Sequence, residues 1–442
     1  MSTATTPASI HRPLGSTETI YWLLDKLYCL NFVVFAEIEG RLDATRLQDA
    51  LATVQSENPL LRAHIVKTHG VYWFKSTSPH APLLPETLPL KNWRQAVERE
   101  LHTPFDTELA PLARFLWFKG TGKKCVVAMS FHHAIADGRS GTAVLLDVLR
   151  RATVDTSPAA HKCAHASSQD LDVIRQKAPL LGALQGVRFW LSKGKEALQF
   201  AQQLPAFDPT PLPTRDVRIL PFAVEPPLLA RLQAQARRHG TTVHGALGAA
   251  LLLAIQDQFD HPVQRRLALN SLADLRGVLN GNLSDRDLGL YVTTLCTVHG
   301  VGPQTDFWSL AREIRDELQH TMDSGDGNLI NGVYPPAPVW GPHTSIAKLV
   351  QGVVSLGPAA SMLTNIGRID TVDLGTDVRV STLGFGVSPP AQHPICITAA
   401  TYGGLMSLHL LHDALKVRPE QAAHIGSSLL AHLDGACRLD GN

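Results

Sequence analysis

The chain has 442 residues, 44% of them hydrophobic and 18% charged, which is enough apolar material for more than one core. Forty Lys and Arg residues face 39 Asp and Glu residues, and the formal net charge is +1. Bulk charge therefore gives no reason to expect nucleic acid or an anionic membrane as a partner. The length predicts two domains rather than one.

The ends and the cysteines indicate the compartment. The first 15 residues lack the basic and then apolar pattern of a secretion signal. The longest apolar run, residues 245–255, is about half as long as a bilayer span. We therefore expect a cytoplasmic protein without integral membrane contact. Six scattered cysteines without a C-x-x-C pair favour reduced thiols, although their even number leaves disulfides open.

The first half of the chain is predicted to mix helices and strands. Apolar residues recur at helical spacing in some segments and form short β-branched or aromatic runs in others. The expected elements, in chain order, are a helix at 20–27, a strand at 31–39, a helix capped by Asp43 and ended by Asn58-Pro59, and hairpins at 61–75 and 113–131.

The second half is predicted to be a separate α/β unit. A helical and Pro-rich stretch precedes it, so we expect an N-terminal lobe at 1–165, a connector at 166–214 and a C-terminal lobe at 215–442. The expected elements are helices ending at 239 and spanning 242–256, strands at 265–271 and 290–298, a helix containing 307–318, a hairpin turning at Gly403-Gly404, and a last helix containing 425–433.

The stretch from His132 to Gly138 carries the chemistry, because it places two imidazoles at the end of an apolar run. The preceding residues 125–131 predict a buried strand, and a helix is expected after Gly138. Side chains alternate along a strand, so His132 and His133 should face opposite sides and only one can act. Asp137 lies in the turn, where it can cap the helix or pair with an arginine.

These and neighbouring residues also permit other interpretations, as a metal site, a structural pair or a phosphate loop. His133 and Asp137 stand four apart, as metal ligands on a helix do, but Gly138 argues against a continuous helix, and no metal is predicted. The pair is also compatible with structural core histidines. Residues 120–123 have the composition of a phosphate loop but fit a hairpin turn better, and no G-x-S-x-G supports a serine hydrolase.

With these residues in place, the chain resembles the condensation-domain superfamily of acyltransferases, whose mark is His-His-x-x-x-Asp-Gly. This superfamily includes chloramphenicol acetyltransferase, the condensation domains of nonribosomal peptide synthetases and the free-standing polyketide-associated acyltransferases. Further segments agree in order, with asparagine for histidine at 58 and threonine for serine at 364. They are 16–18, 58–62, 104–106, 111–114, 274–276, 288–292 and 364–368.

The resemblance implies a fold and a role for each matching residue. The fold is α/β, with two chloramphenicol-acetyltransferase-like lobes arranged as a pseudo-dimer around a tunnel. His133 matches the general base and His132 its supporting neighbour. Asp137 would form an ion pair with Arg276, and Gly138 would allow the turn. Substrate or oxyanion contacts would come from a backbone N–H near Gly138 or from Asn365 and Thr364.

The resemblance also implies the reaction. His133 would deprotonate a hydroxyl acceptor, which attacks an acyl thioester and forms an ester without a covalent enzyme intermediate. The donor would be a thioester on phosphopantetheine, carried by coenzyme A or by an acyl carrier protein, with no cofactor bound permanently. We expect a role in polyketide, lipid or secondary-metabolite biosynthesis. An amine acceptor, and hence amide formation, stays open, as does a catalytically silent module that binds carrier proteins.

Overall fold

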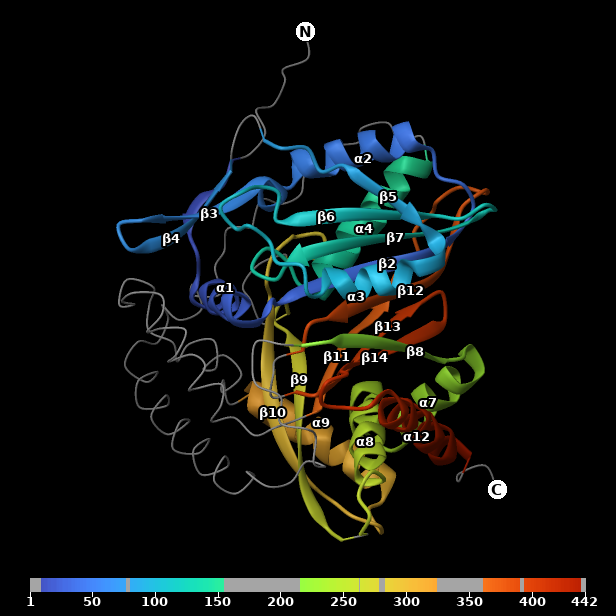
Figure 1. Ribbon diagram of the computed structural model, residues 1–442. Helices are drawn as coiled ribbons and strands as arrows, with labels where there is room; N and C mark the ends of the chain where they lie inside the picture. The colour runs from blue at the N-terminus through green and yellow to red at the C-terminus, as the bar shows by residue number, and fades with distance from the viewer. Residues whose placement is uncertain are drawn as a thin grey trace.

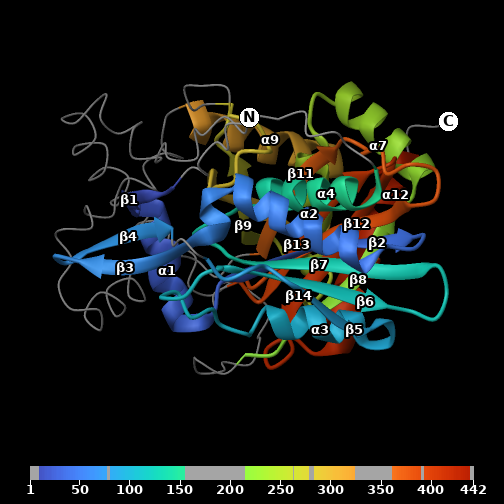
Figure 2. The ribbon, with the colours of Figure 1, turned by 90° about the horizontal axis from the view of Figure 1, so that it is seen from above.

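The computed structural model describes residues 9–76, 80–154, 215–261, 263–277, 283–323, 361–389 and 393–438. Two large sheets lie one above the other in Figure 1, each with helices on its outer side, and they form the α/β fold with two lobes. A small sheet of three strands stands beside the upper lobe (Figures 1 and 2). Its strands, in spatial order, are β1 (His11–Pro13), β4 (Val71–Ser76) and β3 (Ala63–Thr68).

The first lobe is built on a five-stranded sheet. In spatial order its strands are β12 (Arg379–Val387), β2 (Asn31–Glu39), β7 (Lys124–His132), β6 (Ala113–Lys119) and β5 (Pro85–Pro89). The helices and 3-10 turns of this lobe are α1 (Ser16–Tyr28), α2 (Ala44–Glu57), η1 (Pro59–Arg62), η2 (Leu90–Asn92), α3 (Trp93–Glu100) and α4 (Gly138–Thr153).

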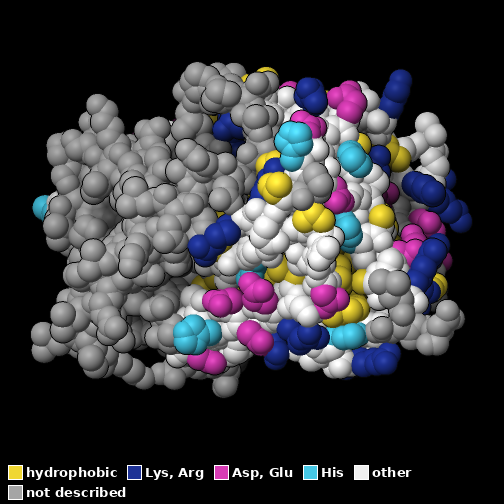
Figure 3. Space-filling model, turned by 90° about the horizontal axis from the view of Figure 1, so that it is seen from below, with side chains coloured by type: hydrophobic (Ala, Val, Ile, Leu, Met, Phe, Trp, Pro, Cys, Tyr) yellow, Lys and Arg dark blue, Asp and Glu magenta, His cyan; other side chains and the backbone are white. Residues whose placement is uncertain are grey.

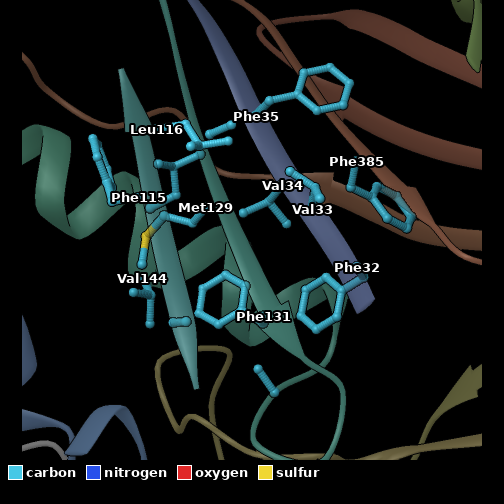
Figure 4. Close-up of a cluster of buried hydrophobic side chains, with 14 of the residues drawn as sticks. Phe32, Val33, Val34, Phe35, Phe115, Leu116, Met129, Phe131, Val144 and Phe385 are labelled. Atoms are coloured by element: carbon cyan, nitrogen blue, oxygen red, sulfur yellow. The ribbon is translucent and has the colours of Figure 1, made fainter. Parts of the chain in front are cut away.

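Aromatic and β-branched side chains fill the core of the first lobe. Figure 4 shows Phe32 and Phe35 of β2, Phe115 of β6 and Phe131 of β7 gathered around the strands, together with Phe385 of β12. All five are at most 1% exposed. Burying such large side chains contributes strongly to stability and holds β7 in the middle of the sheet.

The second lobe is built on a six-stranded sheet. In spatial order its strands are β10 (Val292–Val301), β9 (Arg265–Asp274), β11 (Ser361–Ile369), β13 (Ile395–Tyr402), β14 (Leu405–Asp413) and β8 (Val217–Val224). The helices are α7 (Pro226–Arg238), α8 (Val243–Gln256), α9 (Phe307–Asp323) and α12 (Pro419–Arg438). From Gly245 onward every residue of α8 is buried, because the helix packs against the sheet as well as against α9 and α12.

One strand departs from the division expected at residue 215. We assigned everything after that residue to the C-terminal lobe, but β12 pairs with β2 along its length, from Arg379 opposite Glu39 to Val387 opposite Phe32. The chain thus leaves the second sheet after β11, adds an edge strand to the first sheet and returns as β13. Alternating β propensity in a strand does not indicate which sheet it will join. The connector expected at 166–214 lies outside the described residues.

The two sheets share an internal arrangement. In the first sheet, β6 pairs parallel with β5 and antiparallel with β7, and β7 pairs antiparallel with β2. In the second sheet, β13 pairs parallel with β11 and antiparallel with β14, and β14 pairs antiparallel with β8. A helix follows the hairpin in each lobe, α4 after β7 and α12 after β14. This repeat is one of topology, and we found no short repeat in the sequence.

Most elements expected from periodicity are present. The caps at Asp43 and the turn at Gly403-Gly404 are confirmed, since Asp43 accepts the N–H of Arg46 and both glycines have positive φ. Among the described residues, periodicity did not indicate the strands β1, β5, β8, β11 and β12, the helix α3, or the 3-10 turns η1 and η2. Within the described ranges, we find no helix with the length and apolar character needed to cross a membrane.

Candidate active site

β7 carries the two histidines to one end of the first sheet. Every residue of this strand after Lys124 is buried, and the strand is paired on both sides, with β2 and β6. His132 lies opposite Asn31 and donates its backbone N–H to the carbonyl of Leu112 at 3.0 Å. The strand ends at His132, and His133 is the first residue of the turn that follows. The backbone at the histidines is therefore held on both sides.

His133 is almost enclosed but retains 9% exposure. The ring centroids of Tyr21 and Phe32 lie 4.7 Å and 4.9 Å from that of His133. Nδ1 of His133 lies 3.1 Å from the carbonyl oxygen of Ala136. A carbonyl can only accept, so Nδ1 carries the proton and Nε2 keeps its lone pair. Burial lowers the pKa of His133 from 6.5 to about 4, which leaves the ring neutral near pH 7.

His132 has different neighbours and is fully buried. Its Nδ1 accepts the backbone N–H of Ala134 at 3.1 Å, so the proton is on Nε2. Nε2 lies 3.4 Å from Oδ2 of Asp25. Burial raises the pKa of Asp25, but the contact with His132 and the N–H of Leu30 outweigh it, and the pKa is lowered overall. The N–H of Ala134 thus defines the tautomer of His132, and the carboxylate of Asp25 faces its protonated nitrogen.

Asp137 closes the turn and is completely buried. Its carboxylate caps α4 by accepting the N–H of Ser140 at 2.9 Å, and the other oxygen accepts the N–H of Tyr291 at 3.0 Å. The expected ion pair is present, with Nη2 of Arg276 at 3.0 Å from Asp137. Arg276 also binds Asp274 at 2.9 Å. A buried carboxylate with this many donors stays in place, and it ties the turn to the second lobe.

Arg139, the first residue after the motif, connects three parts of the chain. Its guanidinium binds both carboxylate oxygens of Asp285 at 2.6 Å and 2.7 Å, and its Nη1 donates to the carbonyl of Ile366 at 2.6 Å. Ser140 adds a hydrogen bond to the carbonyl of Gly289 at 3.2 Å. The segment between β9 and β10 and the strand β11 are therefore both anchored to the start of α4.

β11 contains a bulge where the sequence has Asn365-Ile366-Gly367. Its pairing with β13 shifts between Asn365 and Arg368, and Gly367 has φ +76, which glycine adopts without strain. The Asn365 side chain accepts the N–H of Gly367 at 2.8 Å. The bulge brings Ile366 close to Gly138, where an added Cβ would lie only 3.0 Å from Ile366 Cγ2. This close approach favours glycine at 138, because a larger residue would push against Ile366.

The two residues expected to contact substrate occupy β11. Thr364 is 5% exposed and Asn365 is partly exposed. Neither side chain forms a hydrogen bond with His133 among the described residues. The contact that reaches the motif from this strand comes instead from Ile366, through its side chain and its carbonyl. Their contact with substrate or with an oxyanion stays a prediction.

Sequence reasoning missed Asp25, Arg139 and Asp285. Asp25 carried a weak signal, because it is an acid within an otherwise apolar helix face. Arg139 adjoins the motif, but its partner Asp285 is 146 residues away and no spacing connects them. Tertiary contacts of this kind cannot be read from local periodicity.

Comparison with known proteins shows the family of the chain. The family model described as "Condensation domain" matches residues 23–329, which is more than half of the chain. The chain belongs to the condensation-domain family. Tyrocidine synthase 3 of Brevibacillus parabrevis is 24% identical over 300 residues, covering 65% of this condensation-domain chain and 4% of the synthase. The chain therefore spans a small part of that relative's length.

Solved structures share the fold over nearly the whole condensation-domain chain. Polyketide synthase associated protein 5 from Mycobacterium tuberculosis has a TM-score of 0.65 at 16% identity, with 97% of this chain and 100% of that chain covered. The trichothecene 15-O-acetyltransferase from Fusarium sporotrichioides has a TM-score of 0.72 at 12% identity, with 98% and 97% covered. The first condensation domain of the CDA synthetase has a TM-score of 0.73 at 13% identity, with 97% and 96% covered. At these identities the likeness concerns the fold.

Proposed function

We propose that this protein is an O-acyltransferase that transfers an acyl group from a thioester to a hydroxyl acceptor, with His133 as the general base. One observation carries the proposal. The bond to the Ala136 carbonyl places the proton of His133 on Nδ1, and burial keeps the ring neutral, so Nε2 has a free lone pair at neutral pH. A general base requires this state.

In the proposed reaction, His133 moves one proton from the acceptor to the leaving thiolate while the acyl group is transferred. Nε2 of His133 takes the proton of the acceptor hydroxyl while its oxygen attacks the thioester carbonyl. The tetrahedral adduct collapses, its C–S bond breaks, and the leaving thiolate receives the proton from Nε2. A backbone N–H at Gly138 or the side chain of Asn365 is proposed to stabilise the oxyanion. No covalent intermediate with the protein is needed, because a thioester is already activated.

The family supports a proposal for the donor and the acceptor. Condensation domains and polyketide-associated proteins work with substrates bound to carrier proteins, and we propose a phosphopantetheine thioester, on a carrier protein or coenzyme A, as the donor. The Fusarium enzyme is named an O-acetyltransferase, which supports a hydroxyl acceptor over an amine. We also propose a tunnel between the lobes, reached by donor and acceptor from opposite mouths.

The test is the release of free thiol from acyl thioesters in the presence of alcohols or amines. We expect His133→Ala to lower the rate about 10²- to 10⁴-fold, the usual contribution of a general base. The matched control is His412→Gln, because His412 is also buried and its Nδ1 also lies near a carbonyl, that of Val417 at 2.9 Å. This control should keep its rate.

Three other results would change the assignment. Equal rates for the wild type and His133→Ala would indicate a silent binding module. Turnover with amines but not with alcohols would indicate amide formation. Equal losses in His133→Ala and His412→Gln would point to a general structural effect instead of a base, since only one of these rings has its Nε2 beside the motif.

A further inference from the structure

Five cationic side chains lie at one end of the first sheet, and His133 follows the strand β7 at the other end. Together they form what we call the basic tip, which comprises Arg41, Lys91, Lys119, Lys123 and Lys124. All five are exposed. Three of them flank the turn between β6 and β7, which projects from the sheet in Figures 1 and 2.

The other two cations reach the same turn through the backbone. Pro89 of β5 lies opposite Lys119 of β6, so Lys91 follows directly beside it. Leu90 packs against the turn, because a Cβ added to Gly120 would lie 2.8 Å from Leu90 Cδ2. The N–H of Gly40 donates to the carbonyl of Lys123 at 2.6 Å, which places Arg41 at the turn. Three segments distant in sequence thus meet there.

The cations of the basic tip form no ion pair with any described carboxylate. Glu39 is the acid opposite Lys124, but Arg379 binds it with Nε at 3.0 Å. Because Arg379 binds Glu39, this carboxylate is already paired outside the basic tip. On the described part of the face shown in Figure 3, by contrast, both cationic and anionic side chains are present.

The composition of the basic tip indicates what it can bind. Protein interfaces are depleted in lysine and depend on buried aromatic or apolar anchors, and the tip has four lysines. The aromatic ring beneath Lys119, that of Trp117, is only 4% exposed and offers no open face on which a nucleobase could stack. Lysines on a convex turn suit a diffuse anionic surface, such as the headgroups of acidic phospholipids.

We propose that the basic tip docks this protein on anionic phospholipid membranes, as a peripheral contact without insertion. Each cation near such a surface adds to the attraction, so five give measurable binding at low salt. β7 spans nine residues from Lys124 to His132, about 27 Å at the usual rise per residue. Membrane contact at the tip therefore leaves the motif region uncovered, and the inference does not depend on the chemistry of His133.

The experiment is co-sedimentation of the full chain with phosphatidylcholine vesicles, with and without about one third phosphatidylserine. We expect binding only to the anionic vesicles, and its loss at high salt. The triple variant Lys91→Glu, Lys123→Glu, Lys124→Glu should bind at least tenfold more weakly. It spares Lys119, whose ammonium lies 3.5 Å from the Trp117 ring centroid.

A second triple variant provides the matched control. Arg99→Glu, Arg237→Glu, Arg418→Glu changes the net charge equally, at exposed positions outside the tip, and should bind nearly as the wild type does. Equal loss in both variants, or no binding to anionic vesicles at low salt, would overturn the proposal. Tighter binding to duplex DNA than to vesicles at equal phosphate concentration would also overturn it. A gentler triple, with glutamine replacing each tip lysine, covers the case in which the charge reversal misfolds.

Discussion

The unit formed by β6, β7 and α4 and the unit formed by β13, β14 and α12 have the same backbone, yet only the first carries a candidate active site. β7 ends at His132 and α4 begins at Gly138, while β14 ends at Asp413 and α12 begins at Pro419, so both turns have the same length. Corresponding positions are therefore defined residue by residue.

Backbone hydrogen bonds repeat at these positions. The N–H of His132 donates to Leu112 at 3.0 Å, and that of Asp413 donates to Pro394 at 3.4 Å. Within the turns, Ile135 donates to His132 at 3.1 Å and Lys416 to Asp413 at 2.8 Å. Strand pairing and the start of a helix are thus sufficient to shape the turn, whatever side chains it carries.

The side chains differ where the chemistry would occur. Ala414 stands at the position of His133, and the exposed Arg418 at that of the buried Asp137. The described part of the segment between β9 and β10 contacts the first turn, through Arg276, and has no counterpart bond at the second turn. The fold therefore forms the same strand-to-helix turn twice, but the candidate site also needs the imidazole and an anchoring arginine.

The largest effect on stability should come from Asp137→Ala. This change leaves the buried Arg276 without one of its two carboxylates and removes the cap of α4, so we expect a loss of about 3 kcal/mol or more in the free energy of unfolding. Arg418→Ala, at the corresponding exposed position, should stay within about 0.5 kcal/mol. Urea unfolding measures both, and similar losses would mean that the two turns are equally anchored.

The next effect concerns pH. The pKa of His133 is lowered to about 4 in the folded protein and is near 6.5 when unfolded, so only the unfolded chain gains a proton between these values. Stability from this group is complete above pH 6.5 and is lost as the pH falls towards 4, by about 1.4 kcal/mol per unit of lowering.

Burial also lowers the pKa of His412 in the second unit, so the same sign applies there. We expect both His133→Gln and His412→Gln to flatten the decline of unfolding free energy below pH 6.5, and for His133 this window extends to about pH 4. The rate should separate them, because in wild type and in His412→Gln kcat/KM should fall only near pH 4. A fall centred near pH 6.5 would show that His133 is not desolvated.

A smaller loss is expected from Arg139→Gln. Arg139 acts as a positioning residue, since it anchors Asp285 and the Ile366 carbonyl to the start of α4. We expect kcat to fall about tenfold with KM little changed. The loss is moderate because the charged hydrogen bonds of Arg139 are partly exposed to solvent. Arg139→Lys should restore part of the rate. Glu420→Ala, at the corresponding position of α12, should leave it unchanged, and an equal loss there would contradict the role of Arg139.

The smallest effect is expected from Ala414→His, which places an imidazole on the second turn. In the His133→Ala background we expect no recovery of thiol release, because the second turn lacks the counterpart of the Arg276 anchor. Recovery of even a few per cent of the wild-type rate would show that the repeated backbone is sufficient for a site.

Much of the local structure could be predicted from the sequence. The apolar run before His132, the cap at Asp43 and the turn at Gly403-Gly404 express local rules, and the structure agrees with them. The partnership of Asp137 with Arg276 was implied only by family resemblance. Asp25 beside His132 could not be predicted, because no periodicity relates helix α1 to the end of β7.

The sequence by itself determined the strand, turn and helix around the motif, since these depend on near neighbours in the chain. Three other features depend on contacts between distant segments. β12 joins the first sheet, and Arg139 binds Asp285 and Ile366. Five cations also lie at one tip, although the net charge of the chain is +1. The physical reason is the same in each case. Contacts between distant segments depend on which sheets close together, and local propensity carries no information about that.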